Sequence, residues 1–289
     1  MNATPYAPNT EGIFRMPAAD YHKAPGVGKH SLDYINDSPE AYALYRKHGM
    51  EATDAMEIGT LCHTAVLEYE KFQDSFYIRP DKFKSGEKQA WDATHGDKPS
   101  ITHAEMSRID NIAASCRNHP VVSALLEDGE AELSMFARCP ITGVMRKSRP
   151  DWITRDANNR VTIVDFKFVA DATKHGFAKQ VAELRYYVQH AYYVDLLELL
   201  KNRIDTKVEL INARFLFVAV AKQPMHAETS KHRMIVYECH PQDVEMGRNQ
   251  YLRDLMRFAE CEKSGVWPDD TDKIQVLQLP SWVRRENAI

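Results

Sequence analysis

The chain has 289 residues, of which 44% are hydrophobic and 27% are charged, the composition of a soluble globular protein that can bury a substantial core. The formal net charge of −4 excludes a surface that is basic throughout, so any contact with nucleic acid requires a local basic patch. No apolar run approaches the length of a membrane span and the N-terminus lacks the features of a secretory signal, so we expect a cytoplasmic protein.

The N-terminal part of the chain is predicted to be an extended arm followed by helices. Residues 1–28 are rich in Pro, Ala and Gly and favour an extended arm. A helix is expected from Ser31, a candidate N-cap, and Ser38 followed by Pro39 restarts it, because proline suits the first helical position. The apolar spacing over about 56–70 predicts the next helix.

A less regular stretch comes next. Residues 72–100 show no clear period apart from a possible short strand at 76–78. Thr102 and Glu105 have the spacing of a capping box, which predicts that a helix begins there. One or two further helical turns are expected after Pro120.

The second half of the chain alternates strands and helices. Strands are predicted over 130–138, 143–155, 160–169, 213–221 and 233–238, and helices over about 174–201 and 241–263. Residues 156–159 supply the turn between the second and third strands. A hairpin joined by a helix to a further strand indicates an α/β fold with a central mixed β-sheet flanked by helices. We expect a single domain over 29–266 and a loop-like tail over 267–289.

Two carboxylates and one amine are predicted to converge on this hairpin. The turn places Asp151 roughly opposite residue 164, and a slip of one residue would place Asp165 there. The side chains of Asp165 and Lys167 leave the same face of their strand, because successive residues alternate. Uncompensated carboxylates in contact repel each other, and a hard divalent cation, Mg²⁺ or Mn²⁺, relieves that repulsion. Lys167 would then orient a water or offset charge on a phosphate.

A surface hairpin with solvated aspartates and a salt-bridged lysine is the alternative interpretation. The apolar run at 161–164, followed by Phe166 and Phe168, instead indicates a strand that is buried on nearly both faces. Charge in such a strand is costly without a partner, so the pattern favours metal-dependent hydrolysis of a phosphodiester.

Several motifs in the chain resemble those of one nuclease superfamily. PD at 150–151 and DFK at 165–167 are similar to the PD-(D/E)xK signature, and QHAYY at 189–193 matches the Q-x-x-x-Y motif of its RecB-like branch. GTLCHTAVLE at 59–68 resembles the G-T-x-x-H-x-x-x-L-E segment of exonuclease VIII (RecE) proteins. Shorter similarities to the same proteins lie at 20–22 and 31–42.

The resemblance implies a Mg²⁺-dependent exonuclease that degrades linear double-stranded DNA ends in the 5′→3′ direction, leaving 3′ single-stranded tails for phage-type recombination. Such proteins form closed ring-shaped homo-oligomers in a bacterial or phage-infected cytoplasm and work with a RecT-like single-strand annealing protein. A single-strand nuclease, an endonuclease or a non-catalytic DNA-end-binding subunit on the same fold is the alternative. Iron–sulfur relatives are disfavoured, because the five cysteines lack the close spacing that a cluster requires.

The resemblance also assigns roles to individual residues. Metal ligands would be Asp151, Asp165 and His63, and the catalytic residues would be Asp151, Asp165, Lys167, Gln189 and Tyr193. His63 lies off the apolar stripe of its helix, so it can face a cleft instead of the core. Glu132 would be an acid behind the ligands.

Polar and basic residues near these motifs have two interpretations each. Arg146, Lys147 and Arg149 would form a track for DNA phosphates, or merely a solvated sheet edge. Ser31 would bind a 5′-phosphate with the backbone N–H groups of a helix start, or simply cap that helix.

Overall fold

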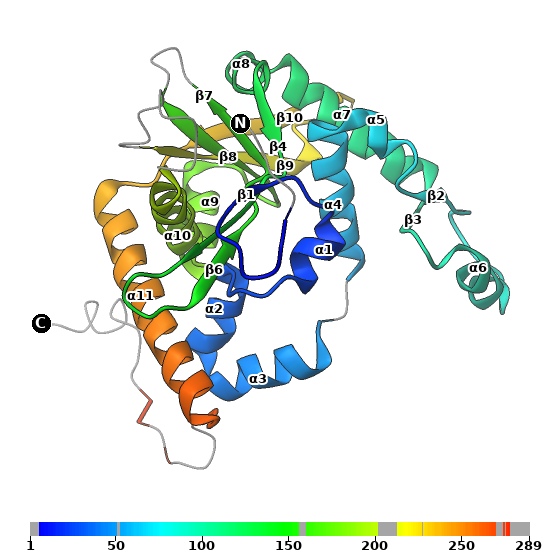
Figure 1. Cartoon of the computed structure of the whole chain (residues 1–289). Helices are drawn as coiled ribbons and strands as arrows, with labels where there is room; N and C mark the ends of the chain where they lie inside the picture. Colours follow the sequence, from blue (N-terminus) through cyan, green and yellow to red (C-terminus); the bar gives the residue numbers. More distant parts are fainter. Residues whose placement is uncertain are drawn as a thin grey trace, which may run out of the picture.

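The computed structural model describes residues 6–50, 53–155, 160–201, 213–226, 228–269, 274, 276 and 277. The predicted turn at 156–159 and most of the predicted tail lie outside these residues. The described part is an α/β fold whose central sheet carries helices on both faces, as the sequence indicates (Figure 1). No helix in it is both long and apolar enough to cross a membrane.

The central sheet has five strands. In spatial order they are β10 (His232–Tyr237), β9 (Arg214–Pro224), β8 (Val161–Val169), β7 (Trp152–Arg155) and β4 (Gly129–Ala131). β8 runs parallel to β9, whereas the other neighbouring pairs are antiparallel, so the sheet is mixed as predicted. β8 is an interior strand, and its first six residues are all buried, which agrees with its apolar run.

The register of β7 and β8 decides which residue lies beside Asp151. Trp152 pairs with Val164 and Ile153 pairs with Ile163. The residue that continues this register opposite Asp151 is therefore Asp165, one position beyond the midpoint estimate from the sequence. The slip of one residue that the carboxylate pair requires is the register that the protein adopts.

Two hydrophobic cores lie on opposite faces of the central sheet. One lies under α2 (Lys29–Asp37), α9 (Lys174–Glu183), α10 (Tyr186–Leu199) and α11 (Pro241–Ser264), and the other under α4 (Asp54–Leu67), α7 (His103–Asn118) and α8 (Pro120–Leu126). β8 alternates between them, because Ile163 belongs to the first core and Val164 and Phe166 to the second. Asp165 and Lys167 share the parity of Ile163, so their side chains leave the sheet on the α10 side.

A second, smaller sheet stands beside the central one. Its strand order is β1 (Gly12–Phe14), β5 (Ser134–Arg138) and β6 (Met145–Ser148). The helix α1 (Ala18–Lys23) packs on it through Tyr21, which contacts the ring of Phe136. Residues 12–14 and 18–23 are thus built into the fold, although the composition of 1–28 favours an extended arm. The short helix α3 (Pro39–His48) follows α2, and the Ser38 hydroxyl accepts a hydrogen bond from the Ala41 N–H, as expected of its cap.

Two long strands predicted from the sequence are each divided between the sheets. The stretch 130–138 forms β4 and β5, and the stretch 143–155 forms β6 and β7. Pro150 lies at the second division, where it has no N–H to donate to a ladder and biases the preceding residue. At the first division Glu132 adopts a left-handed conformation with φ of 57°, which no sequence signal announces.

The predicted long helix over 174–201 is also divided. α9 ends at Glu183 and α10 begins at Tyr186, because Arg185 between them is left-handed with φ of 53°. The stretch 72–100, predicted to be irregular, contains α6 (Glu87–His95) between β2 (Tyr77–Ile78) and β3 (Ser100–Ile101). With α5 (Tyr69–Phe72) these elements project from the body of the molecule (Figure 1).

Candidate active site

The candidate site lies where the chain crosses twice from one sheet to the other. The crossings are the segments between β4 and β5 and between β6 and β7, and they touch, because the Glu132 N–H donates to the Asp151 carbonyl at 3.0 Å. Asp151 follows Pro150 and comes directly before β7. Its carboxylate therefore sits beside the strand β8, at a point where the sheet ladder is interrupted.

Both aspartates and the lysine meet at this point. The Asp151 carboxylate accepts a hydrogen bond from the Phe166 N–H at 2.6 Å, across the two strands. Asp165 is 3% exposed and forms an ion pair with Lys167 through Oδ1. The amide of Gln189 on α10 donates to Asp165 Oδ2 at 2.6 Å. The convergence predicted from the hairpin is thus present, and α10 supplies a fourth group.

His63 reaches the same point from α4. Its Nδ1 lies 3.2 Å from Asp151 Oδ2, and its ring meets Phe168 edge to face, with centroids 5.0 Å apart. Its neighbours Leu61 and Cys62 point into the core and are 2% and 1% exposed. The stripe argument therefore placed His63 correctly, off the core and beside the carboxylates.

The two carboxylates have opposite proton affinities. Burial alone would raise the pKa of Asp151, but the positive charges of His63 and Lys167 outweigh burial and hold that pKa below its ordinary value. Burial raises the pKa of Asp165, and the attraction of Lys167 does not offset this rise. Burial opposes the ammonium of Lys167, yet the two aspartates raise its pKa, so the amine stays charged.

The fold and this constellation are those of a known superfamily. Residues 31–280 match the model of a PDDEXK-like domain of unknown function, DUF3799. The chain belongs to the PDDEXK-like family. This membership confirms the PD-(D/E)xK resemblance and supports nuclease activity.

Solved structures agree with the PDDEXK-like fold. The crystal structure of a protein from Eubacterium rectale that is provisionally named an exonuclease matches with a TM-score of 0.57 and 13% identity, over 95% of this chain and 99% of that one. At this identity the match shows the fold alone. The crystal structure of SSO0001 matches at 13% identity over 69% of this chain and 85% of that one, but its TM-score of 0.28 carries no argument. No curated protein matches the chain.

PDDEXK nucleases generally use divalent metals, and the donor atoms of this site fit such an ion. Asp165 Oδ1 and His63 Nδ1 are both buried and lack an aligned hydrogen bond within the described part of the chain. Mg²⁺ commonly uses one or two protein carboxylates and takes its other ligands from water and phosphate. Two carboxylates suffice for that mode, although no cluster of three or more His, Cys, Asp or Glu side chains suited to a metal occurs among the described residues.

The two residues of the Q-x-x-x-Y motif have different surroundings. Gln189 is buried against Asp165, as described above. Tyr193 is partly exposed at the edge of a large pocket, and burial together with nearby tyrosine and aspartate charges raises the pKa of its hydroxyl. Its neighbour Tyr192 is completely buried and donates to the Val27 carbonyl. Tyr192 therefore packs α10 onto the fold while Tyr193 faces the site.

The predicted phosphate track needs correction at Arg146. That side chain is 2% exposed, lies over the rings of Tyr192 and Tyr251, and donates to the Tyr192 carbonyl at 2.6 Å. Lys147 is partly buried and donates to the carbonyls of Tyr21, His22 and Ala24 at the end of α1. Arg146 is thus a structural cation, and Lys147 has committed its three N–H groups to the backbone.

Arg149 and Ser31 lie nearer the site than Arg146. Arg149 is ion-paired with Glu132 and donates to the Ser134 hydroxyl at 2.8 Å, so Glu132 stands behind Asp151 and anchors an arginine. Ser31 is not the N-cap predicted from the sequence, because α2 begins at Lys29 and Gly28 precedes it. Ser31 still lies in the first turn of α2 and lines the large pocket.

Sequence reasoning missed two residues beside the catalytic lysine. The ring of Tyr186 lies under the Lys167 ammonium, 4.6 Å from ring centroid to Nζ. Lys29 lies 5.9 Å from the same ring and donates to the Leu184 carbonyl at 2.6 Å. The tyrosine run at the start of α10 was the only signal for Tyr186. Lys29 had none, because it comes to the site from α2.

Proposed function

We propose that the chain is a Mg²⁺-dependent exodeoxyribonuclease that degrades linear double-stranded DNA from its 5′ ends and leaves 3′ single-stranded tails. The observation that carries this proposal is the meeting of Asp151, Asp165 and Lys167 at one interruption of the sheet. Mn²⁺ is a plausible substitute ion, because it takes the same carboxylate ligands. The polarity and the role in strand-annealing recombination rest on the motif resemblance.

Each residue has a role that its contacts support. A bound divalent cation supplies Lewis-acid activation of a water and neutralises phosphate charge. Asp151 and Asp165 would hold that ion, while the Phe166 N–H fixes the orientation of one carboxylate and Gln189 that of the other. The Lys167 ammonium is positioned to stabilise negative charge that develops on the phosphate oxygens. His63 would orient Asp151 or add a nitrogen ligand.

A digestion experiment with matched DNA substrates tests this function. Linear duplexes labelled at the 5′ or the 3′ end and covalently closed circles of the same sequence are incubated with Mg²⁺. We expect early release of the 5′ label, intact circles, and no turnover in EDTA. Cutting of closed circles at the rate of linear DNA would instead indicate an endonuclease.

Variants of the three converging groups test the site itself. We expect Asp151→Asn, Asp165→Asn and Lys167→Met to lower the rate at least about a hundredfold, because each removes a charge that acts on the transferring phosphate. Lys179→Met, at an exposed position of α9, is the matched lysine control and should keep the full rate. Full activity of Lys167→Met would remove that lysine from the chemistry.

The partners remain proposals that rest on the resemblance. They are a ring-shaped homo-oligomer and a RecT-like single-strand annealing protein. The mass of the native protein in solution decides whether the chain assembles.

A further inference from the structure

A large pocket opens beside the candidate active site. Its volume is about 1330 Å³, and it lies between α1, α2, α3, α11 and β6. Tyr193 and Arg149 line its inner end. Both residues border the acidic centre, because Tyr193 feels the charges of Asp151 and Asp165, and Arg149 is paired with Glu132. The pocket therefore continues from the place where a phosphodiester would be cut.

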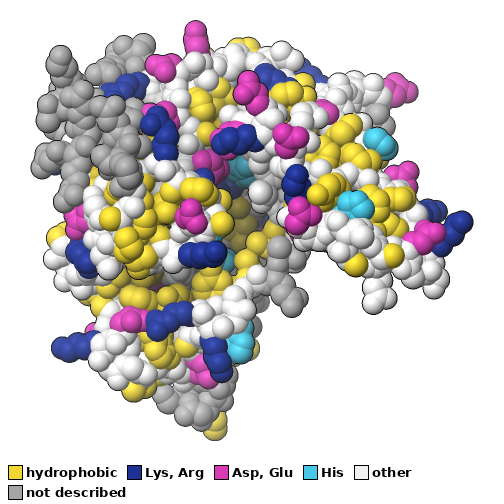
Figure 2. Space-filling model, turned by 45° about the vertical axis from the view of Figure 1, so that its right-hand side comes forward, with side chains coloured by type: hydrophobic (Ala, Val, Ile, Leu, Met, Phe, Trp, Pro, Cys, Tyr) yellow, Lys and Arg dark blue, Asp and Glu magenta, His cyan; other side chains and the backbone are white. Residues whose placement is uncertain are grey.

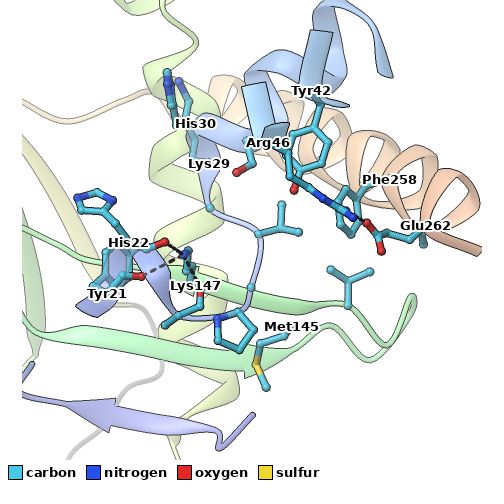
Figure 3. Close-up of a pocket in the computed structure, with 18 of the residues that line it drawn as sticks. Tyr21, His22, Lys29, His30, Tyr42, Arg46, Met145, Lys147, Phe258 and Glu262 are labelled. Atoms are coloured by element: carbon cyan, nitrogen blue, oxygen red, sulfur yellow. Dashed lines mark hydrogen bonds and ion pairs between the residues drawn. The ribbon is translucent and has the colours of Figure 1, made fainter. Parts of the chain in front are cut away.

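The pocket is strongly basic in a chain of net negative charge. Seven Lys and Arg side chains line it against a single carboxylate, Glu262, which is paired with Arg46. Figure 3 shows this pair and Lys147 on opposite sides of the pocket. Lys23 and Lys263 have no carboxylate partner in the part of the chain that the structure describes, so their charges are available to a ligand. Lys and Arg side chains also gather around the hollow of the face in Figure 2.

An aromatic platform forms one side of the pocket. Tyr45 lines the pocket and stacks on Tyr34, with centroids 4.4 Å apart and ring planes 14° from parallel. His30 meets the rings of Tyr34 and Tyr45 edge to face at 5.1 and 5.7 Å. Tyr45 is only partly buried, so its ring is held rigidly and still reaches solvent. Cations beside a fixed aromatic face are the features that bind single strands without sequence preference.

We propose that this pocket binds single-stranded DNA, with a base stacked on Tyr45 and phosphates held by Lys23 and Lys263. The proposal rests on the proposed function, because the bound strand would be the one that passes the catalytic centre at Tyr193. A single strand suits the site better than a duplex, whose bases are already stacked on each other and offer no free face to Tyr45.

Binding without hydrolysis tests the pocket independently of catalysis. The full chain is titrated in EDTA with labelled dT8 and with an abasic eight-unit strand of the same charge, followed by fluorescence anisotropy. We expect wild-type protein to prefer dT8, and Tyr45→Ala to lose roughly tenfold in affinity for dT8 only. Tyr45→Phe keeps the ring and should retain the preference. Free thymidine monophosphate, tested alongside, should bind much more weakly if a strand rather than a single nucleotide is the ligand.

Charge variants provide a second measurement that does not depend on the platform. Lys23→Glu should weaken dT8 and the abasic strand alike and lower the salt dependence by about 0.7 per lost phosphate contact. Lys231→Glu, in a separate pocket between α7 and β10, is the control and should bind as wild type. Equal binding of the two strands by wild type and Tyr45→Ala would overturn the proposal. Tyr45-dependent binding by a protein that cuts no DNA would instead overturn the nuclease function and leave the pocket standing.

Discussion

At the scale of single residues, the site separates two identical side chains by their surroundings. Asp151 lies between His63 and the Phe166 N–H, which favour its charged form, whereas Asp165 lies deeper, where burial opposes charge. Lys167 and the Gln189 amide are the printed partners that compensate Asp165. The orientation of this carboxylate therefore depends on a neutral amide from another element.

Gln189→Ala tests that dependence. The variant leaves Asp165 Oδ2 without its donor, and a hydrogen bond to a charged group contributes about 1.5–3 kcal/mol. We expect the rate of DNA hydrolysis to fall roughly tenfold to a hundredfold. Gln189→Glu should be more damaging, because a further carboxylate then faces Asp165.

The matched control for this variant is Gln180→Ala. Gln180 lies on α9 and donates only a long hydrogen bond of 3.5 Å to the Tyr186 hydroxyl. Its loss should leave the rate unchanged. Wild-type turnover by Gln189→Ala would show that Gln189 contributes packing alone.

At the scale of elements, the start of α10 is set by a buried ion cluster. Arg185 adopts its left-handed conformation while its guanidinium pairs with Asp254 of α11 and donates to Asp33 of α2 at 3.1 Å. Asp254 is 2% exposed. Three helices are thereby tied together one turn before Gln189, so the cluster aims the motif of α10 at the sheet.

Arg185→Met should lower the free energy of unfolding by about 3–5 kcal/mol, because it leaves the buried Asp254 without its main partner. Methionine accepts the left-handed backbone no better than arginine, so the change reports the ion pair. Urea unfolding measures it. Arg253→Met is the control, since Arg253 also contacts Asp254 but its side chain is 62% exposed, and the expected loss is below about 1 kcal/mol. Equal losses in the two variants would contradict this account.

At the scale of the whole molecule, the two cores share one sheet, and the core on the α10 side contains a histidine that cannot easily be charged. His190 is 7% exposed and stacks on Phe215, with ring centroids 5.0 Å apart. Burial lowers the pKa of His190 to about 4. Protonation in the folded state is therefore delayed relative to the unfolded chain, in which histidine titrates near 6.5.

This difference predicts how stability depends on pH. Because the folded-state pKa is lowered, the contribution of His190 is fully present above about pH 6.5 and is lost as pH falls from there towards 4. The loss over that window amounts to about 3 kcal/mol. We expect His190→Gln to unfold in urea with a smaller decrease between pH 7 and pH 5 than wild type. An identical decrease in both proteins would show that His190 is not the group responsible.

The local patterns of the sequence determined much of this protein. Strand alternation placed Asp165 and Lys167 on one face, the apolar run identified β8 as a buried strand, and the Thr102 capping box formed as predicted. These features depend on residues within a few positions of each other, so a single sequence carries them. The motif residues His63 and Gln189 also met at the site, although only a resemblance linked them in advance.

The tertiary structure alone decided how distant elements meet. Arg146 reads as a surface cation but is buried against two tyrosines, and the helix break at Arg185 has neither glycine nor proline to announce it. Lys29 and the Tyr45 platform come to the site region from helices far away in the chain. Burial, ion pairing and left-handed backbone at such positions are stabilised by contacts between remote residues, whose free energies no local period or cap contains.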